Sequence, residues 1–169
     1  MARLLVLSLI MLPMIAFAEP TTMVIPEQKW QLSFDAPPLA KQRESNQPGQ
    51  YMYLGNSDRF TLSLYVETPG CKGGTTHEEF YECFWPKASR NPTIIKESVK
   101  KTCGPNYCKV MYDVQAPWEG RFIKQRNISF LIAYHGKWTD LHVSVVEPTE
   151  NDFTLLDTFE RSLSYSEGH

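Results

Sequence analysis

The chain has 169 residues, of which 42% are hydrophobic and 21% are charged, a composition typical of a globular protein. Lys and Arg number 17 against 19 Asp and Glu, which gives a formal net charge of −2. Binding to nucleic acid or to an anionic membrane needs a concentrated positive face, and the nearest basic runs, residues 96–101 and 124–126, are interrupted. The sequence therefore predicts neither kind of partner.

Residues 1–18 have the pattern of a cleavable secretory signal. Arg3 is their only charged residue, an apolar run follows, and the segment closes with small residues at Ala16 and Ala18. A retained membrane anchor would need roughly 18 apolar residues, whereas this run has about a dozen and contains Pro13. We predict cleavage after Ala18, which would leave a mature chain of net charge −3 in the periplasm or secreted, without membrane attachment.

The first half of the mature chain predicts a loose leader followed by strands. Residues 19–28 hold two prolines without periodicity and are expected to form no regular element. Residues 29–34 alternate between apolar and polar side chains, as a half-buried strand does. Residues 39–49 are polar and are expected to form a mobile loop. Residues 50–54 and 59–67 are expected to form a hairpin across a Gly-Asn-Ser-Asp turn.

The second half predicts two helices around a four-stranded meander. Thr75 and Thr76 each precede a glutamate by three residues, so either can cap a helix that runs to about Trp85. Strands are expected at residues 94–102, 107–114, 121–134 and 137–146, and a second helix from residue 149 to about residue 164. Because the links between strands are short, neighbours should be antiparallel. We therefore predict one α+β domain at residues 29–165, with a central antiparallel sheet of about six or seven strands flanked by helices.

Four cysteines in an exported chain predict two disulfides, because exported thiols meet an oxidising compartment. Cys103 and Cys108 flank a Gly-Pro-Asn turn, which can bring them within bridging distance. This leaves Cys71, in a glycine-rich loop, to pair with Cys83 on the predicted helix. A four-thiolate zinc site is the alternative, but the cysteines lack the paired spacing that structural zinc prefers. We expect no metal and no cofactor.

Four segments together suggest a family. Residues 30–37 (WQLSFDAP), 49–53 (GQYMY), 59–67 (RFTLSLYVE) and 136–144 (GKWTDLHVS), with the closing helix, resemble small bacterial proteins of the Mog1/PsbP-like type. The resemblance lies in the order of the elements and in their general residue pattern, and it includes no catalytic signature. It implies a binding or accessory protein built on a central antiparallel sheet with flanking helices, although a fold does not by itself transfer a function.

No histidine of the chain lies in a metal-binding or triad motif. On the predicted strand 137–146, His142 shares a side with Asp140 and Ser144. Neighbours two apart on a strand stand about 7 Å from each other, too far for the hydrogen bond that a serine nucleophile needs. We therefore expect no catalytic residues, and we expect this polar side of the strand to face solvent.

Four residues are the candidates for binding a partner: Trp85, Trp118, Trp138 and His142. The tryptophans fall at the ends of predicted elements or in turns, where aromatic side chains often anchor protein interfaces. Packing over the ends of the sheet is the commoner role for any single one of them.

The leading functional hypothesis is a non-enzymatic periplasmic or secreted binding protein that holds a protein partner. One version of it is an immunity-type inhibitor of an exported toxin. A first alternative is a small-ligand carrier, whose cleft between the sheet and a helix would be lined by Trp30, Tyr51, Tyr53 and Tyr65. A second alternative is a small hydrolase that uses His142 and Asp140.

Overall fold

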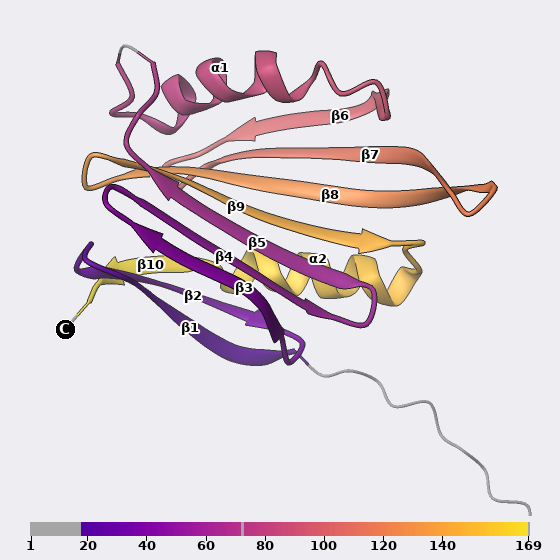
Figure 1. The fold of residues 1–169 in the computed structure, drawn as a ribbon, viewed down its shortest axis with the longest axis horizontal. Coiled ribbons are helices and arrows are strands. Elements are labelled where there is room, and N and C mark those ends of the chain that lie inside the picture. The colour runs from indigo at the N-terminus through magenta and orange to yellow at the C-terminus, as the bar shows by residue number, and fades with distance from the viewer. Residues whose placement is uncertain (1–17, 72, 169) are drawn as a thin grey trace, which may run out of the picture.

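Ten strands and two helices occur among residues 18–71 and 73–168, which are the residues that this computed structural model describes. Seven strands form one antiparallel sheet in the order β3 (Ala40–Gln47), β4 (Gln50–Ser57), β5 (Phe60–Glu67), β9 (Lys137–Val146), β8 (Arg121–Tyr134), β7 (Cys108–Trp118) and β6 (Ile94–Cys103). β1 (Glu19–Ile25), β2 (Trp30–Ala36) and β10 (Ser164–Glu167) form a second sheet in the order β1-β2-β10, and the helices are α1 (His77–Ala88) and α2 (Glu150–Ser162) (Figure 1). The predicted α+β class and central antiparallel sheet are confirmed. The predicted secretory signal, apart from Ala18, lies outside the described residues.

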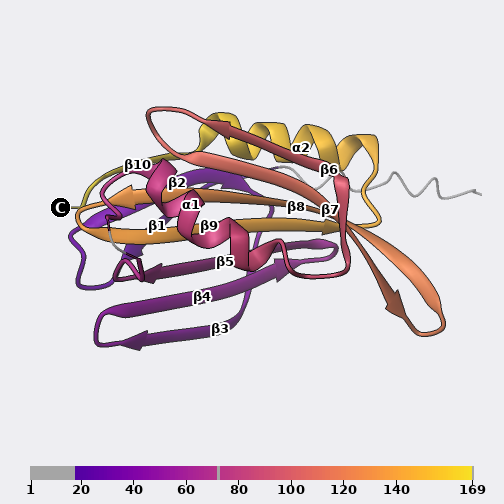
Figure 2. The ribbon, with the colours of Figure 1, turned by 90° about the horizontal axis from the view of Figure 1, so that it is seen from above.

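The main core lies between the large sheet and a layer made of α2 and the small sheet. Alternation along β9 directs Leu141, Val143 and Val145 to this side, where they are buried. Figure 2 shows α2 lying along one side of the sheet. Its fully buried Phe159 meets three rings from the two sheets, those of Phe34, Phe60 and Phe130. This layer therefore depends on apolar burial, at ~1.5–3 kcal/mol for each large side chain.

The opposite face of the large sheet is covered by α1 over β8 and β7. Phe80 is buried on the inner side of α1 and stacks on Trp138 of β9, with ring centroids 4.6 Å apart. Cys108, Val110 and Leu131 complete this smaller buried cluster. The sheet is thus buried on both faces at one end of its central strands, whereas Tyr65 of β5, on the same face as α1, is exposed.

The segment 19–28, for which the sequence predicts a loose leader, contains a strand. β1 pairs with β2 along its whole length, and Ile25 is buried in the main core. The prolines do not prevent this, because Pro20 lies near the start of an edge strand and Pro26 follows its last residue. At the other end, β10 continues the fold to Glu167. The folded unit therefore extends beyond the predicted limits of 29–165.

The predicted mobile loop at residues 39–49 is also largely a strand. It forms β3, which pairs with β4 as the outer edge of the large sheet. Seven of its eight residues are exposed, so no buried alternation marks it in the sequence. A charged and polar edge of this kind prevents pairing with other chains, which explains why a strand here has the composition of a loop.

Both helices begin where the capping pattern predicts. In α1, the Thr76 hydroxyl accepts a hydrogen bond from the Glu79 N–H at 3.1 Å, and the Glu79 carboxylate accepts one from the Thr76 N–H at 3.1 Å. At α2, the Asp152 carboxylate accepts hydrogen bonds from the Thr149 N–H at 2.7 Å and from the Thr149 hydroxyl at 2.6 Å, and the Asp152 N–H donates to the Thr149 carbonyl. The first helix ends at Ala88, later than predicted, because Pro86 removes a single N–H donor and the helical bonding resumes after it, with the Ser89 N–H donating to the Trp85 carbonyl at 2.8 Å.

Both predicted disulfides are present. Cys71 is bonded to Cys83, which ties the glycine-rich loop to α1, and Cys103 is bonded to Cys108, which closes the turn between β6 and β7. No cysteine among the described residues is free.

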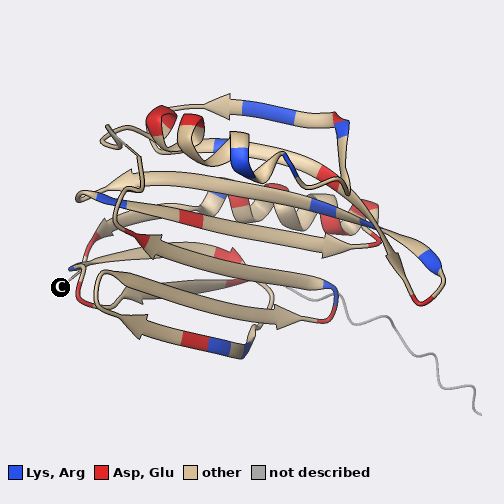
Figure 3. Ribbon diagram, turned by 45° about the horizontal axis from the view of Figure 1, so that its top comes forward, with Lys and Arg blue, Asp and Glu red and all other residues tan. Residues whose placement is uncertain are grey.

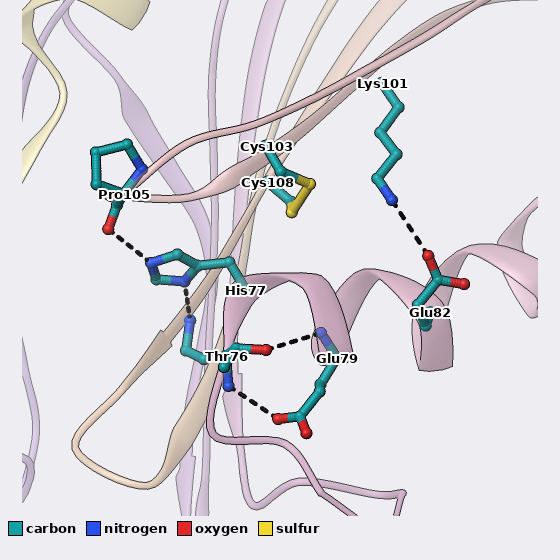
Figure 4. The surroundings of a disulfide bond; sticks show 9 residues. Thr76, His77, Glu79, Glu82, Lys101, Cys103, Pro105 and Cys108 are labelled. Atoms are coloured by element: carbon teal, nitrogen blue, oxygen red, sulfur yellow. Dashed lines mark hydrogen bonds and ion pairs between the residues drawn. A yellow bond between two sulfur atoms is a disulfide. The ribbon is translucent and has the colours of Figure 1, made fainter.

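His77 connects the start of α1 to the turn between β6 and β7, where it contacts Pro105 (Figure 4), and to the end of β8. Its Nδ1 accepts a hydrogen bond from the Ala133 N–H at 2.9 Å, so Nε2 carries the proton and donates to the Pro105 carbonyl at 3.1 Å. The first turn of α1 is therefore fixed to both the Cys103–Cys108 turn and the end of β8.

Candidate functional site

Two of the predicted partner-binding residues belong to aromatic clusters. Trp138 is only 2% exposed, because Phe80 stacks on it, and its Nε1–H donates to the Gly74 carbonyl at 3.0 Å. The prediction that Trp138 offers a binding surface is therefore wrong, since α1 covers this end of β9. Trp85 is half-buried and packs beside Tyr81 and Tyr112.

His142 lies in a polar network within the sheet. The amide nitrogen of Asn127 donates to the Gln125 carbonyl, so the Asn127 oxygen accepts from His142 Nε2–H at 3.0 Å. His142 Nδ1 is then the acceptor for the Ser63 hydroxyl at 3.4 Å. Burial lowers the pKa of His142 to about 4, which leaves a neutral and weakly basic imidazole at pH 7. On this side of β9, Ser144 is buried whereas Asp140 and His142 are half-buried, so the side that was expected to face solvent does so only in part.

Asp140 is not the hydrogen-bond partner of His142, because Ser63 and Asn127 occupy both ring nitrogens. The Oδ1 atom of Asp140 is buried without a hydrogen-bond partner among the described residues. Burial raises the pKa of Asp140 to about 7, and the negative charge of Glu67 acts in the same direction. The two residues of the hydrolase hypothesis therefore do not form a catalytic pair in this structure.

The four aromatic residues of the carrier hypothesis do not meet in one cleft. Trp30 and Tyr51 are buried in the main core, and Tyr53 packs against it. Tyr65 lies on the opposite face of β5 from the buried Leu64 and Val66 of that core and is exposed. These four residues therefore do not line a ligand cleft.

Trp118 is the exposed residue of the predicted set, at 57%. It lies in a projecting hairpin, residues 116–123, which we call the arm. β6 pairs with β7 only as far as Val114, and β9 pairs with β8 only from Gln125 onward. The arm strands therefore pair with each other alone, and they extend beyond the rest of the sheet (Figures 1 and 2).

Phe122 is a second exposed aromatic residue of the arm, at 67%, and sequence reasoning missed it. Trp118 faces Arg121 across the hairpin, whereas Phe122 faces Pro117, so the two aromatic rings lie on opposite sides of the ribbon. A signal existed in the predicted strand lengths, because β8 has 14 residues and its neighbour β9 has 10. Several residues of β8 must therefore lack β9 as a partner.

A cavity of about 270 Å³, which we call the notch, lies where the arm joins the sheet, beside the start of α2. Charged and apolar side chains line it, including Asp113, Lys124, Arg126, Glu147 and Phe153. Arg126 and Asp113 form a two-point ion pair in its wall. Successive side chains of β8 point to opposite faces of the sheet, so Phe122, Lys124 and Arg126 share the face opposite α1. The notch therefore opens on the side of the arm that carries Phe122.

Charges do not single out another surface. Figure 3 shows acidic and basic residues of both signs on the helices and strands, with a basic stretch on β6. In that stretch, Lys101 pairs with Glu82 of α1 at 3.2 Å and lies over the ring of Tyr81, with its Nζ atom 3.8 Å from the centroid. Within residues 18–71 and 73–168, no group of three or more His, Cys, Asp and Glu side chains could hold a metal ion.

No protein-family model matches the chain, and no curated protein matches it. The resemblance to Mog1/PsbP-like proteins therefore stays a prediction. The two disulfides indicate an oxidising environment outside the cytoplasm. None of the described helices is long and apolar enough to cross a membrane.

Proposed function

We propose that this chain is a non-enzymatic binding protein of the periplasm or the secreted fraction, which holds a protein partner with the arm and the notch. The observation that carries the proposal is the exposure of Trp118 and Phe122 on a hairpin whose strands, among the described residues, pair only with each other. Large aromatic side chains in water add little to the stability of a two-stranded ribbon, which is marginal by itself. They are the residues that most often dominate the energy of a protein interface.

The notch extends the arm into a two-part binding surface. Phe122 and Lys124 occupy one side of β8 and lead from the tip of the arm toward the notch. A partner that encloses the arm can therefore place one of its own side chains in the notch and meet the charged groups of Lys124 and Glu147 there. Aromatic anchors surrounded by a charged rim are the usual anatomy of a specific interface.

The structural roles of the candidate catalytic groups favour binding over catalysis. His142 has both nitrogens engaged, and burial holds its pKa far below that of an ordinary general base. In the narrower form of the proposal the partner is an exported toxin, and the arm enters its active-site cleft as an immunity protein would. A projecting hairpin suits that role because it can reach into a concave surface.

Affinity capture with matched variants tests the proposal. The purified protein, the double variant Trp118→Ser/Phe122→Ser and the control Val24→Ser are immobilised and exposed to a periplasmic extract of the source organism. Val24 is a suitable control because it is another exposed large apolar residue, at 64%, on β1. We expect a protein that the wild type and the control both enrich and that the arm variant loses. Equal recovery on all three surfaces, or no enriched protein, would contradict the proposal.

A further inference from the structure

The edge strands of the two sheets differ in how they are protected against pairing with another chain. The outer edge of β3 carries Lys41, Arg43 and Glu44, β6 contains a register shift, and β10 has only four residues. Charges, irregular pairing and short length all hinder the addition of a further strand. β1 has none of these protections, because residues 20–25 contain no charged residue and β1 pairs with β2 without a register shift. None of the described strands pairs with the outer side of β1.

The hydrogen bonds of β2 show which of its residues point toward β10. The Gly168 N–H donates to the Lys29 carbonyl at 2.8 Å, in line with the β2–β10 register. The Asp35 N–H donates to the Ser162 hydroxyl, just before β10, at 2.7 Å. The main-chain groups of successive residues in a strand point to opposite edges. The odd-numbered residues of β2 therefore point to β10, and the even-numbered residues point to β1.

This orientation determines which main-chain groups of β1 are free. Met23 faces Leu32 across the β1–β2 register, so the N–H and C=O groups of Met23 point to β2. Those of Thr22 and Val24 point to the outer edge, and both residues are exposed. Pro20, the next residue with this orientation, has no N–H. Thr22 and Val24 therefore offer two donors and two acceptors to a further strand.

We propose that two copies of this chain form a weak dimer, in which their β1 strands pair antiparallel about a two-fold axis. The axis passes beside Met23, so that Thr22 of each copy lies opposite Val24 of the other. Each Thr22 N–H then donates to a Val24 carbonyl, and each Val24 N–H donates to a Thr22 carbonyl. The pairing joins the three-stranded sheets of the two copies into one continuous sheet.

A second copy fits this edge because β1 is complementary to itself. In a two-fold interface the same surface faces itself, so every donor of one copy must meet an acceptor of the other. The register of Thr22 with Val24 meets this condition for both N–H groups and both carbonyls. A shift in either direction would place Pro20 or Pro26, which lack an N–H, opposite an outward residue of the other copy. Between residues 21 and 25 the pairing brings no like charges together.

The dimer is weak because the paired segments are short. About five residues of each strand bury less than the ~800 Å² per partner of a standard interface, so we expect a dissociation constant of about 0.1–1 mM. The arm belongs to the large sheet, so the dimer is independent of the proposed function. Because main-chain groups make the hydrogen bonds, Val24→Ser retains them and stays a suitable control for capture by the arm.

Amide hydrogen exchange measured by NMR at two protein concentrations tests the pairing residue by residue. The N–H groups of Thr22 and Val24 should exchange more slowly at about 1 mM protein than at about 30 μM, by about twofold or more, because exchange requires the open edge. The N–H of Met23, which points to β2, should exchange at the same rate at both concentrations. This alternation along one strand distinguishes pairing at the edge from a general increase in stability.

Sedimentation equilibrium of two variants of Thr22 tests the hydrogen bonds. Thr22→Pro removes an N–H that the monomer does not use, and dimerisation should weaken by about tenfold or more, because the dimer loses two hydrogen bonds. The matched control Thr22→Val keeps the N–H and should dimerise like the wild type. If Thr22→Pro does not fold, the exchange measurement on the wild type decides. A monomer at about 1 mM, exchange at Thr22 and Val24 that does not depend on concentration, or equal dimerisation of two folded variants would each overturn the inference.

Discussion

Asp140 couples the stability of the protein directly to pH. Burial raises the pKa of its carboxyl group to about 7 in the folded chain, whereas an unfolded Asp titrates near ~3.9. The protonated carboxyl therefore makes its full contribution to the free energy of unfolding below about pH 4, and this contribution is lost as pH rises toward 7. Asp140→Asn removes this loss, so we expect the variant to be more stable than the wild type by a few kcal/mol at about pH 8, at most about 4. Urea unfolding at several pH values measures the difference.

The control for this prediction is the variant Asp157→Asn, which removes the same charge from an exposed position. The advantage of Asp140→Asn should shrink toward zero near pH 4, where the wild-type carboxyl is protonated in both states. A difference in the free energy of unfolding that is the same at pH 4 and pH 8 would show that Asp140 ionises normally in the folded protein.

His142 should respond in the opposite direction. Burial lowers its pKa to about 4, so the neutral form is favoured in the folded state. The stability that this group contributes is present above the ordinary pKa of His, near ~6.5, and is lost as pH falls through that value toward 4. We expect an NMR titration of the His142 ring in the folded protein to have its midpoint near 4. A midpoint close to the ordinary value would instead place the ring in contact with water, against the network with Ser63 and Asn127.

Residue types alone did not determine which candidate residues are exposed. Trp118 and Trp138 both lie at a strand end next to a turn, and their local sequences give no reason to treat them differently. Tertiary structure separates them, because α1 returns over the end of β9 and buries Trp138, while nothing in the described structure covers the end of β7. The burial of His142 has the same origin, since its neighbours Ser63 and Asn127 come from strands that are distant in sequence.

At the scale of elements, the structure shows which of two threonines caps α1. The sequence alone allows either Thr75 or Thr76. Thr76 is the N-cap residue and accepts the Glu79 N–H, whereas the Thr75 hydroxyl only donates to the Glu79 carboxylate, at 3.2 Å. We expect Thr76→Ala to destabilise the protein by about 1 kcal/mol and to speed amide hydrogen exchange in the first turn of α1. Thr75→Ala is the matched control and should cost less. An equal cost for the two variants would contradict the assignment of the cap.

Elements with a strong local signal were predictable, and elements defined by pairing were not. The capping patterns at Thr76 and Thr149 are short-range, and both helices begin there. β1 and β3 are edge strands whose exposed residues carry little apolar alternation, so their sequences resemble a leader and a loop. Their strand structure depends on neighbours β2 and β4, which supply the hydrogen-bonding partners. The arm was not predicted, because the residue patterns of β7 and β8 do not show where the neighbouring strands β6 and β9 end.

At the scale of the whole molecule, the sheet divides the buried residues into two unequal parts. The main core joins both sheets and α2, whereas the cluster under α1 is much smaller and involves only α1 and the large sheet. Both disulfides lie at the smaller cluster, as does the His77 bridge. Small buried clusters contribute little stability by themselves, so the covalent links are placed where the apolar burial is weakest.

Removal of each disulfide tests this division. We expect Cys71→Ala/Cys83→Ala to cost about 3 kcal/mol and Cys103→Ala/Cys108→Ala about 2 kcal/mol, because the first closes the longer loop of the unfolded chain. Hydrogen exchange should accelerate in α1 when Cys71–Cys83 is absent, while the amides of β2 and β5 in the main core stay protected, since local openings follow the weaker cluster. Urea unfolding gives the two costs, and exchange measured by mass spectrometry gives their location. Uniform acceleration across both faces of the sheet would mean that the two clusters open as one unit and that the bridges stabilise the fold as a whole.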